Sequence, residues 1–101
     1  MASLITVFWR DIPSQVIVKS GRKAAKRELS NRFIRAIDLA AAHAGAKSED
    51  AYLAEWRRSD PVDCGDDLEA EADAAAAQLE AEYDIHRLAV LARRNGRESR
   101  S

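Results

Sequence analysis

The sequence has few of the residues that crosslink a chain or anchor it in a membrane. Its single cysteine, Cys64, excludes a disulfide within the chain and is typical of a reducing compartment. No run of about eighteen apolar residues is present, so no membrane span is expected. The first residues lack the basic segment of a secretory signal. We predict a cytoplasmic protein with one domain, residues 1–95, and a flexible polar tail at 96–101.

The sequence is also poor in residues that perform catalysis. Its two histidines, His43 and His86, fall within expected helices, where surface or core histidines are common. Cys64 lies among four aspartates, and nearby carboxylates raise the pKa of a thiol and suppress the thiolate. These aspartates lack the spacing of a calcium loop, and no Cys/His set has zinc spacing. No catalytic residue, metal site or cofactor is predicted, and a non-enzymatic protein is favoured over an enzyme.

Charge, by contrast, is abundant and unevenly distributed. The net charge is −1, but residues 1–47 hold nine basic and three acidic side chains. Residues 48–84 hold two basic and thirteen acidic side chains, and residues 85–101 hold five basic and one acidic. Such blocks either attract one another within the fold or bind an external partner.

Two stretches near the start of the chain favour β-strands. Residues 2–9, ASLITVFW, are rich in β-branched and aromatic residues and are mostly apolar on both faces. Pro13 fixes φ and lacks an amide donor, which places a turn at residues 10–14. Residues 15–19, QVIVK, then close a hairpin. An isolated hairpin is marginally stable in water, so a third strand is expected.

Residues 51–58, AYLAEWRR, are predicted to supply that strand, although their composition also suits a helix. In a strand, Tyr52, Ala54 and Trp56 share one face. In a short helix capped by Ser48, Tyr52 packs against Trp56. We predict the strand and keep the helix as the alternative.

Two long helices complete the prediction. The first covers residues 20–44, because apolar residues recur there at spacings of three and four, with Ser20 as N-cap and Gly45 after its end. The second covers residues 68–94 and carries a seam of alanines. The predicted fold class is α+β, a small antiparallel sheet in the order β-β-α-β-α with two long helices on one face. The alternative is a β-hairpin with three helices.

The first half of the first helix is basic, which is unusual because a helix N-terminus favours negative charge. A glycine turn and free backbone N–H groups beside basic side chains favour a phosphate or a carboxylate. The residues of this predicted anion-binding site are Gly21, Arg22, Lys23, Lys26 and Arg27. Alternatively, these cations are solvated or pair with the acids of residues 66–73. Nucleic acid is disfavoured, because the chain is slightly acidic overall.

A second candidate surface is the hairpin tip, where Trp9 precedes the turn. An amphipathic aromatic residue often contributes to an interface at such a position, although aromatic residues also form cores. The residues predicted for an interface with a protein partner, or with a second copy in a homodimer, are Trp9, Arg10, Ile12, Tyr52 and Trp56.

Several short segments resemble a known family. The most specific is Trp9-Arg10-Asp11-Ile12-Pro13 followed by Gln15-Val16, and supporting segments are Gly21-Arg22-Lys23, Ala51-Tyr52-Leu53 and Trp56-Arg57. Over roughly residues 3–90 the chain resembles a small bacterial domain family labelled "virulence factor". The resemblance implies no assigned activity and no catalytic residue. Family members that consist of this domain alone look like ones encoded beside enzymes of tetrahydrofolate and corrinoid one-carbon metabolism. The resemblance therefore implies an accessory role to such an enzyme.

Two functions from different classes remain open. The first is a non-enzymatic accessory or interaction protein that engages a protein partner. The second is a binder of an anionic small molecule or nucleic acid through the basic start of the first helix.

Overall fold

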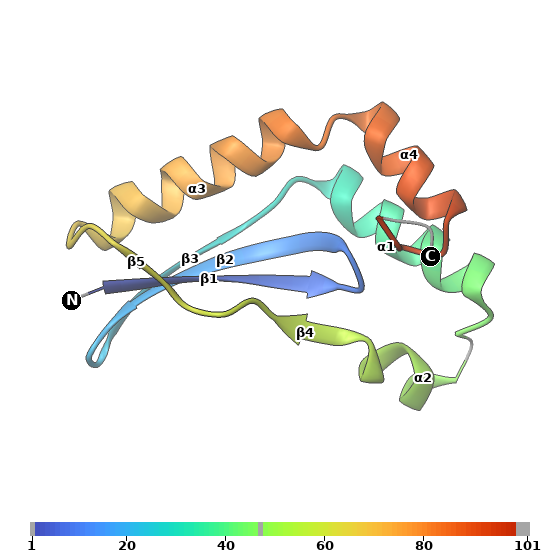
Figure 1. Ribbon diagram of the computed structural model, residues 1–101, viewed down its shortest axis with the longest axis horizontal. Helices are drawn as coiled ribbons and strands as arrows, with labels where there is room; N and C mark the ends of the chain where they lie inside the picture. The colour runs from blue at the N-terminus through green and yellow to red at the C-terminus, as the bar shows by residue number, and fades with distance from the viewer. Residues whose placement is uncertain (1, 47, 99–101) are drawn as a thin grey trace.

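The computed structural model describes residues 2–46 and 48–98, which form five strands and four helices (Figure 1). The strands are β1 (Ala2–Trp9), β2 (Ile12–Ser20), β3 (Lys23–Glu28), β4 (Trp56–Arg58) and β5 (Val62–Cys64). The helices are α1 (Asn31–Ala44), α2 (Glu49–Ala54), α3 (Leu68–Glu82) and α4 (Ile85–Arg93).

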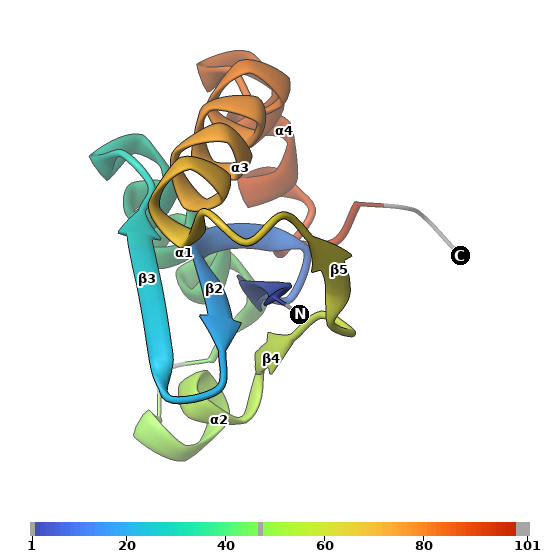
Figure 2. The ribbon, with the colours of Figure 1, turned by 90° about the vertical axis from the view of Figure 1, so that its left-hand side faces the viewer.

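The five strands form one antiparallel sheet in which β2 lies between β3 and β1. The other edge of β1 pairs with β5 near its start and with β4 near its end. Helix α3 runs along the sheet over β2 and β3, while α1 and α4 pack together beside one end (Figure 1 and Figure 2). The predicted α+β class is confirmed, but the order of the elements differs from the prediction.

The apolar core has two parts. The first lies between α3 and the sheet, and its buried members are Ala2, Val16, Val18, Ala25 and Ala72. The second lies among α1, α4 and the turn after β1, and its largest buried members are Trp9, Ile12, Phe33, Ile37, Leu88 and Leu91. Since successive side chains of a strand point to opposite faces, the first part uses only alternate residues of β2.

The predicted helix over residues 20–44 is wrong in its first half. Strand β2 continues to the turn at Gly21, where φ is 60°, and the basic residues that follow form β3. Helix α1 begins only at Asn31. Lysine, arginine and alanine favour helix locally, but β3 gains backbone hydrogen bonds from β2 and buries Ala25 beneath α3. Pairing with a neighbouring strand therefore outweighs the local preference.

Residues 51–58 contain parts of both structures that the sequence allowed. Helix α2 comes first, and the hydroxyl of Ser48 accepts a hydrogen bond from the amide of Ala51 at its start (3.1 Å). Strand β4 follows, so the predicted third strand is shorter than expected. The rings of Tyr52 and Trp56 meet edge to face with centroids 5.9 Å apart, which confirms the contact expected of the helical alternative.

The predicted second helix, residues 68–94, is divided at Tyr83 and Asp84. The Asp84 carboxylate accepts a hydrogen bond from the amide of Arg87 (2.8 Å) and so caps a new helix, α4. The buried ring of Tyr83 packs against Phe33 of α1, with centroids 6.1 Å apart. The cap and the aromatic contact together turn α4 toward α1.

The turn after β1 joins distant parts of the chain. Trp9 is fully buried, and its indole Nε1 donates a hydrogen bond to the backbone oxygen of Tyr52 (2.9 Å). Arg10 has φ 54°, and its amide donates to the carbonyl of Glu55 (3.1 Å). Arg57 in turn donates from Nε to the carbonyl of Arg10 (2.8 Å). The turn therefore fixes α2 and β4 to the end of β1.

The same turn holds the residues that follow α4. Gly96, where the flexible tail was predicted to begin, is buried against the ring of Trp9. The amide of Asp11 donates to the carbonyl of Gly96 (2.8 Å), and the amide of Glu98 donates to the Asp11 carboxylate (2.6 Å). The rest of the predicted tail, residues 99–101, lies outside the described residues.

Replacing Trp9 with alanine is expected to destabilise the protein far more than replacing Trp56 with alanine. Removing a fully buried tryptophan costs about 3–5 kcal/mol, a large part of the roughly 5–15 kcal/mol that a domain has in total. Trp56 is only half-buried and leaves a smaller cavity. Urea denaturation followed by circular dichroism measures both, and equal losses would contradict this burial. Trp9→Phe keeps an aromatic ring, so it should cost less than Trp9→Ala; it removes the indole hydrogen bond, about 1 kcal/mol, and leaves a smaller cavity.

Candidate functional site

The predicted interface residues are divided between the core and the surface. Trp9 and Ile12 are completely buried, so their prediction as interface residues is corrected. The physical reason is that α1, α4 and Tyr52 cover the end of the hairpin, which the sequence alone leaves open. Arg10, Tyr52 and Trp56 are half-buried.

Arg10 has a structural role within the turn. One terminal nitrogen donates to the carbonyl of Asn95 (2.8 Å), and Nε lies 3.3 Å from the carboxylate of Glu55. The guanidinium also lies over the ring of Trp9, 5.0 Å from its centroid. Because of these contacts, only 14% of the Arg10 side chain is exposed to a possible partner.

The predicted anion-site residues are separated by the sheet. Gly21 and Arg22 form the turn between β2 and β3, so the helix N-terminus that motivated this site does not exist there. Because side chains alternate along β3, Lys23 and Arg27 share the face that α3 covers, whereas Lys26 lies on the opposite face.

Arg27 is neutralised within the protein. Its Nε donates to the Asp73 carboxylate (2.6 Å), and a terminal nitrogen pairs with Glu69. Hydrogen bonding to Glu69, and then to Asp73, raises the pKa of Arg27 above its usual value. The alternative prediction, pairing with the acids of residues 66–73, is therefore confirmed for Arg27. Anion binding by the other four residues stays a prediction.

The face of the sheet opposite α3 carries a different group of side chains. The register places Ile5 opposite Ile17, and it places Val7 between Gln15 on β2 and Arg58 on β4. These residues alternate with Val16 and Val18, which face α3. The centre of this second face is therefore apolar, with polar and basic side chains around it.

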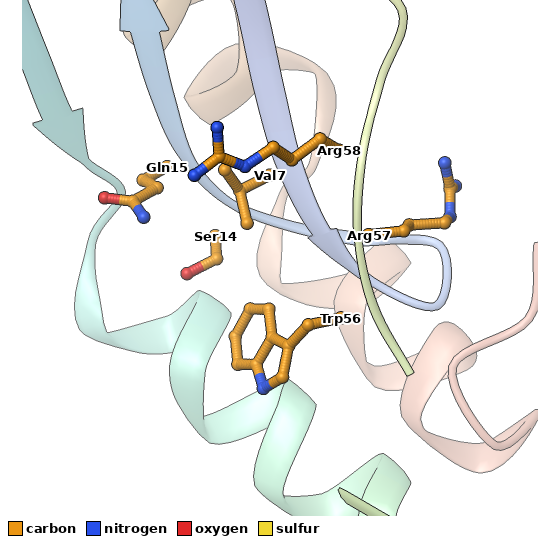
Figure 3. Close-up of a pocket in the computed structure, with 6 residues that line it drawn as sticks. All are labelled: Val7, Ser14, Gln15, Trp56, Arg57 and Arg58. Atoms are coloured by element: carbon orange, nitrogen blue, oxygen red, sulfur yellow. The ribbon is translucent and has the colours of Figure 1, made fainter. Parts of the chain in front are cut away.

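A hollow of about 380 Å³ lies on this face, where β4 meets β1 (Figure 3). Val7 and Ser14 lie between the side chains of Gln15, Arg58 and Trp56 (Figure 3). Arg58 extends from β4 across Val7 toward Gln15. Arg57 lines the rim but points away from the hollow (Figure 3). The register of β1 and β2 shifts between Val7 and Phe8, and this irregularity leaves Ser14 beside the hollow.

A second depression continues from the first. It shares Ser14 and Gln15 with the hollow and extends along the start of α1 to Glu28 and Ile34. Ile34 is one of the large apolar side chains that the fold leaves exposed. We call the combined depression the Trp56 groove; its lining includes Val7, Ser14, Gln15, Glu28, Asn31, Ile34, Trp56 and Arg58.

Trp56 packs against neighbouring aromatic rings at the wall of this groove. Its ring packs against Tyr52, and Tyr52 stacks on the buried Trp9 with centroids 5.8 Å apart. Arg58 lies beside it and is exposed. Among the described residues, Arg58 takes part in none of the ion pairs. The groove thus combines an aromatic wall, a largely apolar floor and the positive charge of Arg58, with the carboxylate of Glu28 in the part that extends toward α1.

The groups that could perform chemistry are dispersed. Within residues 2–46 and 48–98, no three His, Cys, Asp or Glu side chains come together as a metal site would require. His43 is exposed near the end of α1 and His86 near the start of α4. On β5, partial burial and then the carboxylates of Glu71, Asp63 and Asp66 raise the pKa of the Cys64 thiol. The direction of this shift agrees with the sequence prediction.

The described helices are also too short or too polar to cross a membrane.

This architecture defines a class: a small α+β domain with a helix-covered antiparallel sheet and one grooved sheet face. Within that class, the chain belongs to the virulence factor family, since the sequence model of that family matches residues 7–92. The match confirms the resemblance carried by the Trp9-to-Val16 segment. Comparison with curated proteins and with solved structures gives no match.

Sequence reasoning missed most of the groove. Trp56 was predicted at an interface, but Val7, Ser14 and Arg58 were not. Gln15 belongs to the segment that carries the family resemblance, which is the one sequence signal that pointed to it. The shifted register that exposes Ser14 leaves no mark in the pattern of apolar residues.

Replacing Arg27 with glutamine is expected to lower the melting temperature at low salt and to lower it less at high salt. The reason is that its pairs with Glu69 and Asp73 are exposed, so mobile ions screen them. Lys26→Gln is the matched control on the other face of β3, and we expect it to change the melting temperature little at either salt concentration. Scanning calorimetry at two salt concentrations measures both variants; identical responses would contradict the internal role of Arg27.

Proposed function

We propose that the protein is a non-enzymatic interaction module whose Trp56 groove binds a protein partner. The partner segment carries an apolar side chain followed by a carboxylate. The observation that supports this proposal is the position of two side chains in the hollow, over its largely apolar floor. The Trp56 ring packs on Tyr52, and Arg58 takes part in none of the ion pairs among the described residues.

Both side chains are of the types that dominate binding energy at protein interfaces. Tryptophan and arginine are enriched among hot-spot residues, most of all where packing holds them in place before binding. Tyr52 and Trp9 provide that packing here. The bound segment loses little free energy to rearrangement of this wall, because the wall is continuous with the core.

The charge of the open face favours an acidic partner. The register places three cations on this face, Lys19, Lys26 and Arg58, against two acids, Glu28 and Asp63, so its charge is slightly positive. Complementary charge raises association rates and selects against basic partners. The family resemblance implies a cytoplasmic enzyme of one-carbon metabolism as the partner, which is the first protein to examine. An anionic small molecule at the same cations is the competing function.

The test compares variants that differ only at the groove. Proteins captured from a bacterial lysate by the wild-type chain are identified and purified, and their affinities are measured by calorimetry. Trp56→Ala is expected to weaken binding by about 30-fold or more, since hot-spot truncation costs about 2 kcal/mol or more. Arg58→Glu is expected to weaken it further, and to reduce the dependence of affinity on salt.

Arg22→Glu is the control, because Arg22 is an exposed cation at the β2–β3 turn, a position predicted for anion binding. Binding that persists in the groove variants and is lost with Arg22→Glu would overturn the proposal and favour the anion site. A melting temperature raised by phosphate or polyglutamate in the wild type, but not in Arg58→Glu, would favour the small-molecule function instead.

A further inference from the structure

A second apolar groove lies between α1 and α4, which pack side by side at the end of the molecule (Figure 1). Its hollow is about 370 Å³. Its lining residues from α1 and α4 are mostly apolar, and the small ones among them are Ala36, Ala89 and Ala92.

The shape of this groove suits a helix. Leu39 on α1 and Ile85 on α4 form ridges, and they are 56% and 72% exposed. Three alanines also line the groove, and two of them, Ala36 and Ala92, are buried; small side chains of this kind let the backbone of an added helix approach closely. Amphipathic helices bind such grooves through apolar residues at positions i, i+3 or i+4, and i+7.

The positive charge of the groove favours a helix that carries an acidic residue beside its apolar face. Arg32 and Arg35 line the groove, and no carboxylate among residues 2–46 and 48–98 does. Arg32 is already occupied, since it pairs with Glu80 (2.9 Å) and donates to the carbonyl of Tyr83 (3.2 Å). Arg35 is exposed, and among the described residues it takes part in none of the ion pairs.

Acidic residues do occur on the same two helices. Asp38 follows Arg35 by three positions and Asp84 caps α4, but neither side chain lines the groove. The positive charge of Arg35 therefore has no partner at the site itself. A carboxylate on an incoming helix would supply one.

We propose that the α1/α4 groove binds an amphipathic helix of a protein partner, with the apolar face of that helix between Leu39 and Ile85 and an acidic residue against Arg35. This surface differs from the Trp56 groove: the two share Asn31 at the start of α1, and their other lining residues differ. The segment expected here is a helix with apolar residues at helical spacing and an acidic residue. The segment proposed for the Trp56 groove has one apolar side chain followed by a carboxylate.

The test is a selection for peptides that bind the intact folded chain. The displayed library consists of helical peptides whose surface positions are randomised. We expect enrichment of peptides with apolar residues at i, i+4 and i+7 and with Asp or Glu beside them. Leu39→Glu is expected to weaken the selected peptide at least tenfold. Leu53→Glu is the matched control, since Leu53 is a comparably exposed leucine (53%) on α2, and it should leave binding unchanged.

A charge exchange tests the role of Arg35. Arg35→Glu should weaken the acidic peptide, and a peptide with lysine in place of its acidic residue should bind this variant better than the wild type. Enrichment of basic or non-helical peptides, or binding equally insensitive to Leu39→Glu and Leu53→Glu, would overturn the proposal. So would sedimentation that shows self-association abolished by Leu39→Glu, because the occupant would then be a second copy. Trp56→Ala should leave the peptide bound, which separates failure here from failure of the Trp56 groove.

Discussion

The burial of Trp9 is the constraint on which the rest of the structure depends. Its indole lies at the end of β1 and bonds to the backbone of α2, and Gly96 packs on its ring from beyond α4. A large side chain at residue 96 would meet that ring, and the φ of 82° at this position further favours glycine. One side chain thereby links the first strand to the middle and the end of the chain.

The residues that carry the family resemblance are explained largely by this packing. Trp9 and Ile12 are core residues, and Asp11 holds both Arg57 and the segment after α4. The part of the motif that these residues form therefore has a structural role in this chain. The proposed functional contacts lie beside it instead, on Trp56, which Tyr52 connects to Trp9, and on Arg58.

The uneven distribution of charge also has a partly internal explanation. Arg27 of the basic segment pairs with Glu69 and Asp73 of the acidic one, and Arg32 pairs with Glu80. These pairs connect β3 and α1 to α3. Several cations of the described residues take part in none of these ion pairs, among them Lys19, Arg22 and Lys26. Two others of this kind, Arg35 and Arg58, lie at the two grooves, where the proposed partners would meet them.

The sequence by itself determined the fold class, the strand over residues 2–9 and the end of α1 at Gly45, because propensity, glycine and side-chain spacing act locally. Only the tertiary structure decided that residues 23–28 form an edge strand, that the second helix bends at Tyr83, and that Trp9 lies inside. Each of these depends on a partner distant in the sequence: β2 for the strand, Phe33 for Tyr83, and Gly96 with Tyr52 for Trp9. Local preference is worth tenths of a kcal/mol per residue, whereas burial of an aromatic ring is worth about 2 kcal/mol or more, so the distant contacts prevail.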